Sequence, residues 1–262
     1  MKKNRIIELF KQKPTEVLSV FYTAGFPKLT DTVVIAKALE NAGADIIEIG
    51  IPFSDPVADG PTIQASNKVA LDNGMTVELL LKQVKEIRST GVTTPIILMG
   101  YLNPVYQYGV ERFVKDAATA GVDGLILPDM PFYVYEEEYK ALFAEHGLCN
   151  TFLISPTTSE DRIRKIDAAS DSFIYAVSSS STTGVKGDFT SDQLTYFERL
   201  KSMALNNPHL IGFGISNHAA FSRASAYSAG AVVGSAFINL LRDTSDLDSG
   251  IHTFIKQLKA AS

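Results

Sequence analysis

The chain has 262 residues, 45% of them hydrophobic and 20% charged, which is ordinary for a globular protein. Its net charge is −5 and it has no basic run interleaved with aromatic residues, so nothing in it favours nucleic-acid binding. The basic start is not followed by an apolar signal-peptide segment, and no run approaches the ~20 apolar residues of a membrane span. One cysteine, Cys149, fits a reducing compartment. We therefore expect a cytoplasmic protein that does not bind membranes.

Short apolar runs rich in β-branched residues alternate with helical patterns along the chain. A leading helix is expected over 3–11. The eight strands that we expect are 17–22, 45–50, 95–100, 124–127, 150–154, 172–177, 209–213 and 231–233. The helical patterns that follow them are 30–42, 62–71 with 77–88, 110–120, 133–146, 159–169, 192–205, 217–228 and 236–241, and a trailing helix is expected over 250–260.

Strands that are apolar on both sides and separated by helices predict a parallel sheet covered on both faces. Eight such units indicate an α/β protein with a closed (β/α)8 barrel, a TIM barrel, preceded by an extra N-terminal helix. Because no composition break divides the chain, we expect residues 1–262 to form one domain. The competing arrangement is an open doubly wound sheet. It usually has fewer units at this length, and no Gly-x-Gly-x-x-Gly follows the first strand.

The active site of such a barrel lies at the C-terminal ends of the strands. Glu48 lies inside the second apolar strand, on the side of the strand that also carries Ile46 and Gly50. If that side faces the barrel interior, loss of water should raise the pKa of the carboxyl, which could then serve as both acid and base. The alternative is a strand carboxylate paired with a buried cation, but the strand ends offer no Lys or Arg.

The loop over 51–61 is long for a β–α connection and carries two aspartates, Asp55 and Asp59. Either could simply shape a turn, and the residues alone do not choose between them. The sixth strand is followed by a polar stretch, 178–188, which reads as a lid or as a surface linker.

The last two strands give the strongest signal from the residues themselves. Strand seven runs into Gly212-Phe213-Gly214, and strand eight into Gly234-Ser235 before an apolar helical run. Glycines and a helix N-terminus at these positions are typical of a phosphate site in such barrels. The alternative is that the glycines only form tight turns.

Two kinds of chemistry are disfavoured by what the strand ends lack. No Lys ends a strand, which argues against an imine-forming aldolase. The four histidines show no metal-ligand spacing, so we expect no metal.

The segment 48–61, Glu-Ile-Gly-Ile-Pro-Phe-Ser-Asp-Pro-Val-Ala-Asp-Gly-Pro, resembles the signature of tryptophan synthase alpha chains. Motifs of that family also occur in order at 99–104, 128–131, 183–184, 212–216 and 234–235, so the resemblance covers essentially the whole chain. It implies a lyase of tryptophan biosynthesis, which cleaves indole-3-glycerol phosphate to indole and glyceraldehyde 3-phosphate. It also implies an α₂β₂ complex with a beta chain, with pyridoxal phosphate only in the beta chain and no cofactor in this one.

The resemblance assigns roles to individual residues. Catalysis falls to Glu48 and Asp59. The substrate-binding residues are Phe21, Met99, Tyr101, Ile126, Leu153, Tyr175 and Thr183, and the phosphate-binding residues are Gly184, Gly212, Phe213, Gly214, Gly234 and Ser235.

The sequence departs from the family in the sixth loop, where Ser181-Thr182 stands in place of the usual Gly-Val. This keeps an alternative open, in which the chain is a catalytically weak barrel that mainly activates a beta chain. Another phosphate-binding barrel of the same pathway would share the glycines but not the segment from Glu48 to Asp59.

Overall fold

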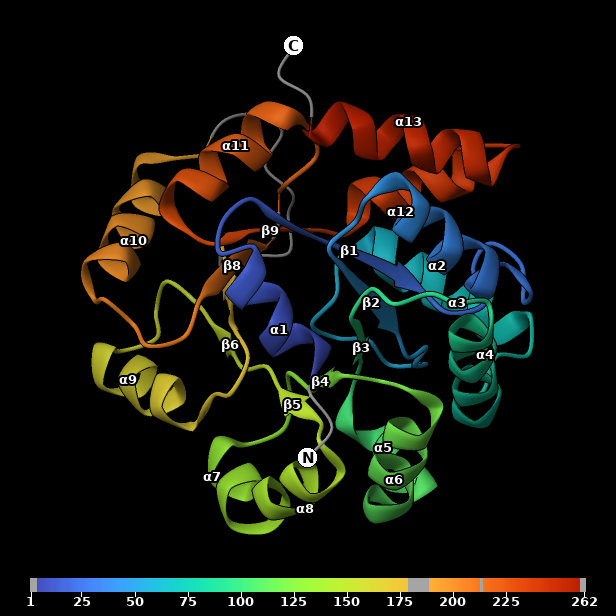
Figure 1. Ribbon diagram of the computed structural model, residues 1–262, viewed down its shortest axis with the longest axis horizontal. Helices are drawn as coiled ribbons and strands as arrows, with labels where there is room; N and C mark the ends of the chain where they lie inside the picture. The colour runs from blue at the N-terminus through green and yellow to red at the C-terminus, as the bar shows by residue number, and fades with distance from the viewer. Residues whose placement is uncertain (1–3, 179–188, 213, 260–262) are drawn as a thin grey trace.

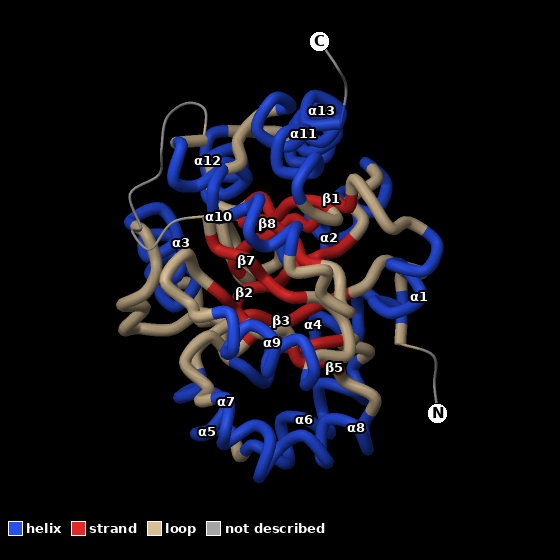
Figure 2. The backbone as a smooth tube through the Cα atoms, turned by 90° about the vertical axis from the view of Figure 1, so that its left-hand side faces the viewer, coloured by secondary structure: helices blue, strands red, loops and turns tan. Residues whose placement is uncertain are grey.

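The structure is a computed structural model that describes residues 4–178, 189–212 and 214–259. One parallel sheet curls at the centre of the molecule, and helices cover its outside (Figure 1; Figure 2). The order of its strands is β5-β4-β3-β2-β1-β9-β8-β7-β6. The strands are β1 (Val17–Thr23), β2 (Ile46–Gly50), β3 (Ile96–Met99), β4 (Gly124–Ile126), β5 (Cys149–Asn150), β6 (Leu153–Ile154), β7 (Ile174–Val177), β8 (His209–Gly212) and β9 (Gly230–Val233).

The sheet closes into a barrel through the segment that contains β5 and β6. β5 pairs with β4, and β6 pairs with β7. Between them, the Thr151 N–H donates to the Leu125 carbonyl at 3.0 Å, and the Tyr175 N–H donates to the Phe152 carbonyl at 2.9 Å. The two ends of the strand order are therefore one short stretch of chain, which hydrogen-bonds to a neighbour on each side.

Helices separate all consecutive strands except β5 and β6, and further helices precede β1 and follow β9. They are α1 (Arg5–Gln12), α2 (Asp31–Ala42), α3 (Pro61–Asp72), α4 (Val77–Ser89), α5 (Leu102–Tyr108), α6 (Val110–Ala120), α7 (Phe132–Val134), the π-helical turn η1 (Tyr135–Tyr139), α8 (Lys140–His146), α9 (Glu160–Ala169), α10 (Ser191–Ser202), α11 (His218–Tyr227), α12 (Ser235–Asp243) and α13 (Leu247–Lys259). In the described part of the chain, no helix is long and apolar enough to cross a membrane.

The α/β barrel and its leading helix are confirmed, with three local differences. The fifth predicted strand is divided into β5 and β6, and the pattern over 133–146 is divided by η1. The third difference is α5, which the sequence did not predict. Pro104 lies in the first turn of α5, where a missing N–H costs no helical hydrogen bond.

Apolar side chains form one cluster inside the barrel and another between the sheet and its helices. The inner cluster includes Val17, Ile46 and Ile97 from three neighbouring strands. It also includes Ile6 of α1, which is fully buried, so the leading helix closes the N-terminal end of the barrel. Asn4 ties this helix down, because its side-chain amide donates to the Asp123 and Gly147 carbonyls at 2.7 and 2.9 Å.

Candidate active site

Glu48 projects into the barrel interior from β2. Ile46 belongs to the inner cluster, and alternation along the strand puts Glu48 on the same side. Its side chain is fully buried. The Ser19 hydroxyl donates to Oε1 at 2.6 Å, whereas Oε2 has no hydrogen-bond partner among the described residues. Burial raises the pKa of Glu48 to about 7, and the Ser19 hydrogen bond opposes part of that rise.

Sequence reasoning missed Ser19. The available signal was a serine inside the apolar run of β1, two residues before Phe21 and so on the same, inner side of the strand. Phe21 pairs in register with Glu48, and Ser19 pairs with Ile46. Ser19 therefore lies diagonally below Glu48 on the neighbouring strand.

Asp59 lies in the loop between β2 and α3, held by Tyr101. The Tyr101 hydroxyl accepts the Ala58 N–H at 2.9 Å and donates to the Asp59 carboxylate. Burial raises the pKa of Asp59 to about 6, and the bond from Tyr101 acts in the opposite direction. Asp55 is exposed and accepts a hydrogen bond from Ser54. The geometry thus favours Asp59 over Asp55, a choice that the residues alone left open.

Tyr175 lies close enough to both carboxyls for their charges to act on its hydroxyl. It reaches the interior from β7, is almost fully buried, and has a pKa raised by burial and by the charges of Glu48 and Asp59. Its ring passes so close to Gly212 that a side chain there would overlap it. Phe21 occupies the corresponding space beside Gly50, where an added Cβ would lie 2.6 Å from the ring. The rings of Tyr175 and Phe21 therefore line the site, and each occupies space that is free only because the residue beside it is glycine.

The other residues assigned to the indole pocket surround the same end of the barrel. Ile126 is buried in the inner cluster, and Met99 and Leu153 pack half-buried against it. Tyr101 packs on Phe53 with ring centroids 5.3 Å apart. Thr183 lies outside the described residues.

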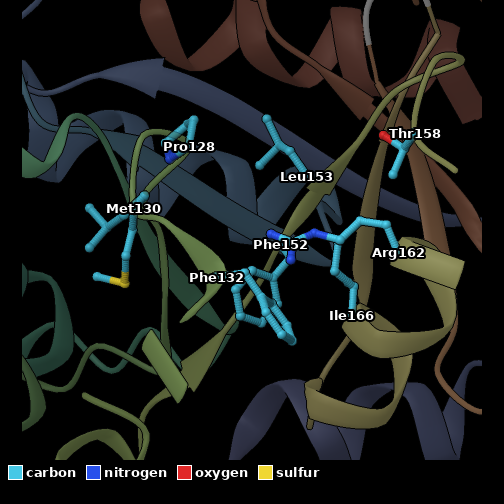
Figure 3. A pocket seen from close by; sticks show the side chains of 9 residues that line it. Pro128, Met130, Phe132, Phe152, Leu153, Thr158, Arg162 and Ile166 are labelled. Atoms are coloured by element: carbon cyan, nitrogen blue, oxygen red, sulfur yellow. The ribbon is translucent and has the colours of Figure 1, made fainter. Parts of the chain in front are cut away.

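A cavity of about 220 Å³ lies next to this group, between the chain after β4 and the start of α9 (Figure 3). Its lining residues are Leu127, Pro128, Met130, Phe132, Phe152, Leu153, Thr158, Arg162 and Ile166. Arg162 stacks its guanidinium 4.4 Å from the centre of the Phe132 ring, at one wall of the cavity. The cavity shares Leu153 with the predicted indole pocket, but neither Glu48 nor Asp59 is among its described lining residues.

Two of the predicted phosphate residues, Gly234 and Ser235, lie at the N-terminus of α12. Gly234 precedes this helix, and no described side chain caps it. By contrast, Asn217 caps α11. The N–H groups that open α12 are therefore available to an anion, beside the exposed Ser235. Gly234 also lies near Phe21, because a Cβ there would be 3.8 Å from the ring.

Gly214 adopts φ +80° and has open space where a side chain would stand. Phe213 and Gly184 lie outside the described residues, so their assigned contacts with phosphate rest on the sequence.

The fold and these groups define a class: a (β/α)8-barrel enzyme with two carboxyls of raised pKa at one end, Glu48 buried in the interior and Asp59 half-buried in the loop above it. Comparison with known proteins gives the family. The family model for the tryptophan synthase alpha chain matches residues 7–261. The tryptophan synthase alpha chain of Flavobacterium johnsoniae is 53% identical over 241 residues, covering 92% of this chain and 94% of that protein.

Solved structures agree with this relationship. The tryptophan synthase alpha chain from Legionella pneumophila has a TM-score of 0.86 at 32% identity, over 98% of this chain and 96% of that one. An aminoacrylate-bound tryptophan synthase from Mycobacterium tuberculosis gives 0.85 at 29% identity, over 98% of both chains. The chain belongs to the tryptophan synthase alpha chain family. Its reaction is the lyase cleavage of indole-3-glycerol phosphate in tryptophan biosynthesis, as the resemblance implied.

Proposed function

We propose that Glu48 and Asp59 carry out the cleavage as an acid/base and an electrostatic partner. Glu48 gives a proton to C3 of the indole ring, which produces an indolenine cation. The bond between C3 and the side chain then breaks, and its electron pair returns to the ring. Glu48 takes the proton of the side-chain hydroxyl as that carbon becomes the aldehyde, so the carboxyl ends as it began. The observation that carries this role is a fully buried carboxyl with a pKa near 7, which has both forms available at neutral pH.

Asp59 has a different task in this scheme. Its pKa of about 6 leaves it mostly ionised at neutral pH. An ionised carboxylate that accepts the indole N–H stabilises the positive charge that the ring carries after protonation. Two carboxyls whose surroundings give them different pKa values can divide the acid/base and charge-stabilising roles.

The remaining assigned residues position the substrate. The indole ring lies among Phe21, Met99, Tyr101, Ile126, Leu153, Tyr175 and Thr183, and the phosphate lies at Gly184, Gly212, Phe213, Gly214, Gly234 and Ser235. Support comes from the uncapped N-terminus of α12 and from its closeness to Phe21, which puts a phosphate site within one small molecule's length of the ring site.

The test is indole release from indole-3-glycerol phosphate by the Glu48→Gln variant, alone and with a beta chain added. The variant should bind substrate and fold as the parent does, yet lose at least about 100-fold in rate, a typical contribution of acid–base catalysis. Glu137→Gln, which alters an exposed carboxylate, is the matched control and should keep full activity. Retention of more than about a tenth of the rate would exclude Glu48 as the acid/base.

The same assay addresses the weak-barrel alternative. A parent chain that is folded but releases no indole, alone or with a beta chain, would support a role as activating partner. The departure at Ser181-Thr182 that motivates this alternative lies outside the described residues.

We further propose that the chain works with a tryptophan synthase beta chain in an α₂β₂ complex, with pyridoxal phosphate held by the beta chain. The related structure from Mycobacterium tuberculosis is a tryptophan synthase in an aminoacrylate-bound form. In this chain, three exposed apolar side chains lie on consecutive connections at the end of the barrel that holds the carboxyls. They are Val57, Tyr106 and Tyr133, with 85%, 50% and 65% of their surface exposed. Exposed large apolar side chains on neighbouring connections at one end of a fold support an interface there.

Association with a beta chain, measured by sedimentation velocity, tests this surface. Val57→Asp should weaken association at least about tenfold, because it would bury an unpaired charge. Val69→Asp makes the same change on α3, where the side chain is 37% exposed, and should leave association unchanged. Equal effects of the two variants would place the interface elsewhere.

We also propose that the chain folds as a single domain and that it is cytoplasmic. One domain over residues 1–262 is supported by the sheet, whose strands come from the whole length between Val17 and Val233 and pair in one continuous order. A reducing compartment is supported by the lone cysteine of the sequence, Cys149, which is buried as a free thiol.

A further inference from the structure

Ser19 makes one hydrogen bond in the described part of the chain through its side chain, and that bond goes to Glu48. Its hydroxyl and the Glu48 carboxylate are both fully buried, with 2.6 Å between Oγ and Oε1. β1 and β2 lie side by side (Figure 1), and their register places Ser19 beside Ile46, two pairs below the pair formed by Phe21 and Glu48 and therefore on the same face of the sheet. The hydroxyl thus reaches diagonally upward to the carboxylate from the neighbouring strand.

The surroundings give Ser19 no evident packing reason to be polar. The inner cluster around it consists of aliphatic and aromatic side chains, among them Val17, Ile46 and Ile97. An alanine or valine at position 19 would avoid burying a hydroxyl, which costs free energy unless that hydroxyl is hydrogen-bonded. The bond to Glu48 offsets that cost, so the two residues depend on each other.

We propose that Ser19 is a positioning residue for the cleavage reaction: its hydroxyl holds Oε1 of Glu48 and leaves Oε2 as the oxygen that exchanges protons with the substrate. The proposal rests on the acid/base role proposed above for Glu48. It is carried by the asymmetry of the carboxylate, whose one oxygen is bound by Ser19 and whose other has no partner among the described residues. The Ser19 bond occupies one lone pair of Oε1, whereas neither lone pair of Oε2 has a partner among the described residues.

A hydrogen bond donated to the ionised carboxylate also favours that form, so Ser19 lowers the pKa that burial raises. Few other charges face Glu48. Tyr175 approaches from β7 and Asp59 from the loop after β2, and the charges of both carboxyls raise the pKa of Tyr175. Ile97 of β3, its register partner on the other side, is apolar, and so is Phe21 of β1. Ser19 is therefore the described group that brings the titration of this carboxyl back toward neutral pH.

The test uses Ser19→Thr and Ser19→Val, a pair of nearly equal shape that differs in whether the hydroxyl is kept. The Glu48 carboxyl is titrated directly in the ligand-free protein by infrared difference spectroscopy, with Glu48→Gln as the blank. The pH profile of kcat/KM is measured in parallel. A hydrogen bond to a charged group corresponds to a shift of about one pH unit.

We expect the valine variant to titrate about one pH unit above the threonine variant, with the Glu48 limb of the kcat/KM profile displaced in the same direction. Thr23→Val is the matched control in the same strand. It removes a buried hydroxyl that bonds to Ser66 at 2.7 Å instead of to Glu48. It should lower the thermal unfolding temperature without moving the Glu48 titration. If Ser19→Val does not fold, Ser19→Ala replaces it.

Equal titrations of the threonine and valine variants would overturn the role of Ser19, and so would a shift of the same size in Thr23→Val. A failure of the underlying acid/base role looks different. In that case the infrared titration still moves with the hydroxyl, but Glu48→Gln keeps its activity and the kcat/KM profile does not follow.

Discussion

Replacing Glu48 by Gln should make the protein more stable at alkaline pH while abolishing cleavage. The carboxyl has a pKa of about 7 in the folded protein, against an ordinary value of 4.5. Between these two pH values the folded protein holds a proton that the unfolded chain has released. The free energy of unfolding therefore falls as the pH rises from about 4.5 to 7, and it is level above that range.

The magnitude follows from the same two values. They differ by about 2.5 pH units, and each unit corresponds to about 1.36 kcal/mol, so ionisation of Glu48 costs about 3 kcal/mol of stability. Gln keeps the shape and can accept the Ser19 hydrogen bond, but its buried amide N–H group lacks a partner, which takes back about 1 kcal/mol. The expected gain at pH 8 is about 2 kcal/mol. Well below pH 4.5, where Glu48 is protonated in both states, the gain disappears and only the loss of about 1 kcal/mol from the unpaired amide remains.

Urea unfolding at several pH values between 4.5 and 9 measures this difference. The parent, Glu48→Gln and the exposed control Glu137→Gln are compared. Where the slope m of the unfolding free energy against urea concentration is the same, a shift of the midpoint reports a change in stability. The gap between Glu48→Gln and the parent should open between about pH 4.5 and 7 and stay constant above, whereas Glu137→Gln should follow the parent throughout. Parallel curves for Glu48→Gln and the parent would refute the claim that burial destabilises the charged form of this carboxyl.

Two further predictions concern the groups around the carboxyls. Tyr101→Phe removes the hydroxyl that lowers the pKa of Asp59 and accepts the Ala58 N–H. Because the pKa of Asp59 then rises and less of it is ionised in acid, the rate of cleavage should fall about fivefold at pH 6 and little at pH 8. An equal loss at every pH would mean that Tyr101 acts only by packing. Ser235→Asp should weaken glycerol phosphate binding at least about tenfold by charge repulsion, measured by calorimetry. Ser191→Asp makes the same change at the start of α10 and should have no effect, and an unchanged affinity in Ser235→Asp would place the phosphate elsewhere.

The barrel could be predicted from the sequence because each strand is a short apolar run that a helix of clear periodicity follows. The fifth strand shows where this reasoning stops. Apolarity predicts one strand over 150–154, but hydrogen bonds to two different neighbours divide it into β5 and β6. Periodicity describes the faces of a strand and carries no information on which strand pairs with which.

The site was predictable where the chemistry of a residue conflicts with its surroundings. A carboxyl in an apolar strand, Glu48, is such a conflict. Gly234 is another, because a glycine stands directly before an apolar helical run. The choice between Asp55 and Asp59 needed the position of Tyr101, which is 42 residues away from Asp59 in sequence. Ser19 was missed because a lone serine in a strand carries no signal until the strand register places it beside Glu48.

The closure of the barrel through residues 149–154 has a consequence for access to its interior. Five register pairs join β1 to β2, but only two join β4 to β5 and two join β6 to β7. Residues 149–154 are thus held to their neighbouring strands by the fewest register pairs, and their amides should exchange with solvent before those of β1 and β2. Leu153 belongs to this segment and borders both the interior and the neighbouring cavity. Local opening of this segment would therefore join the barrel interior to that cavity at Leu153.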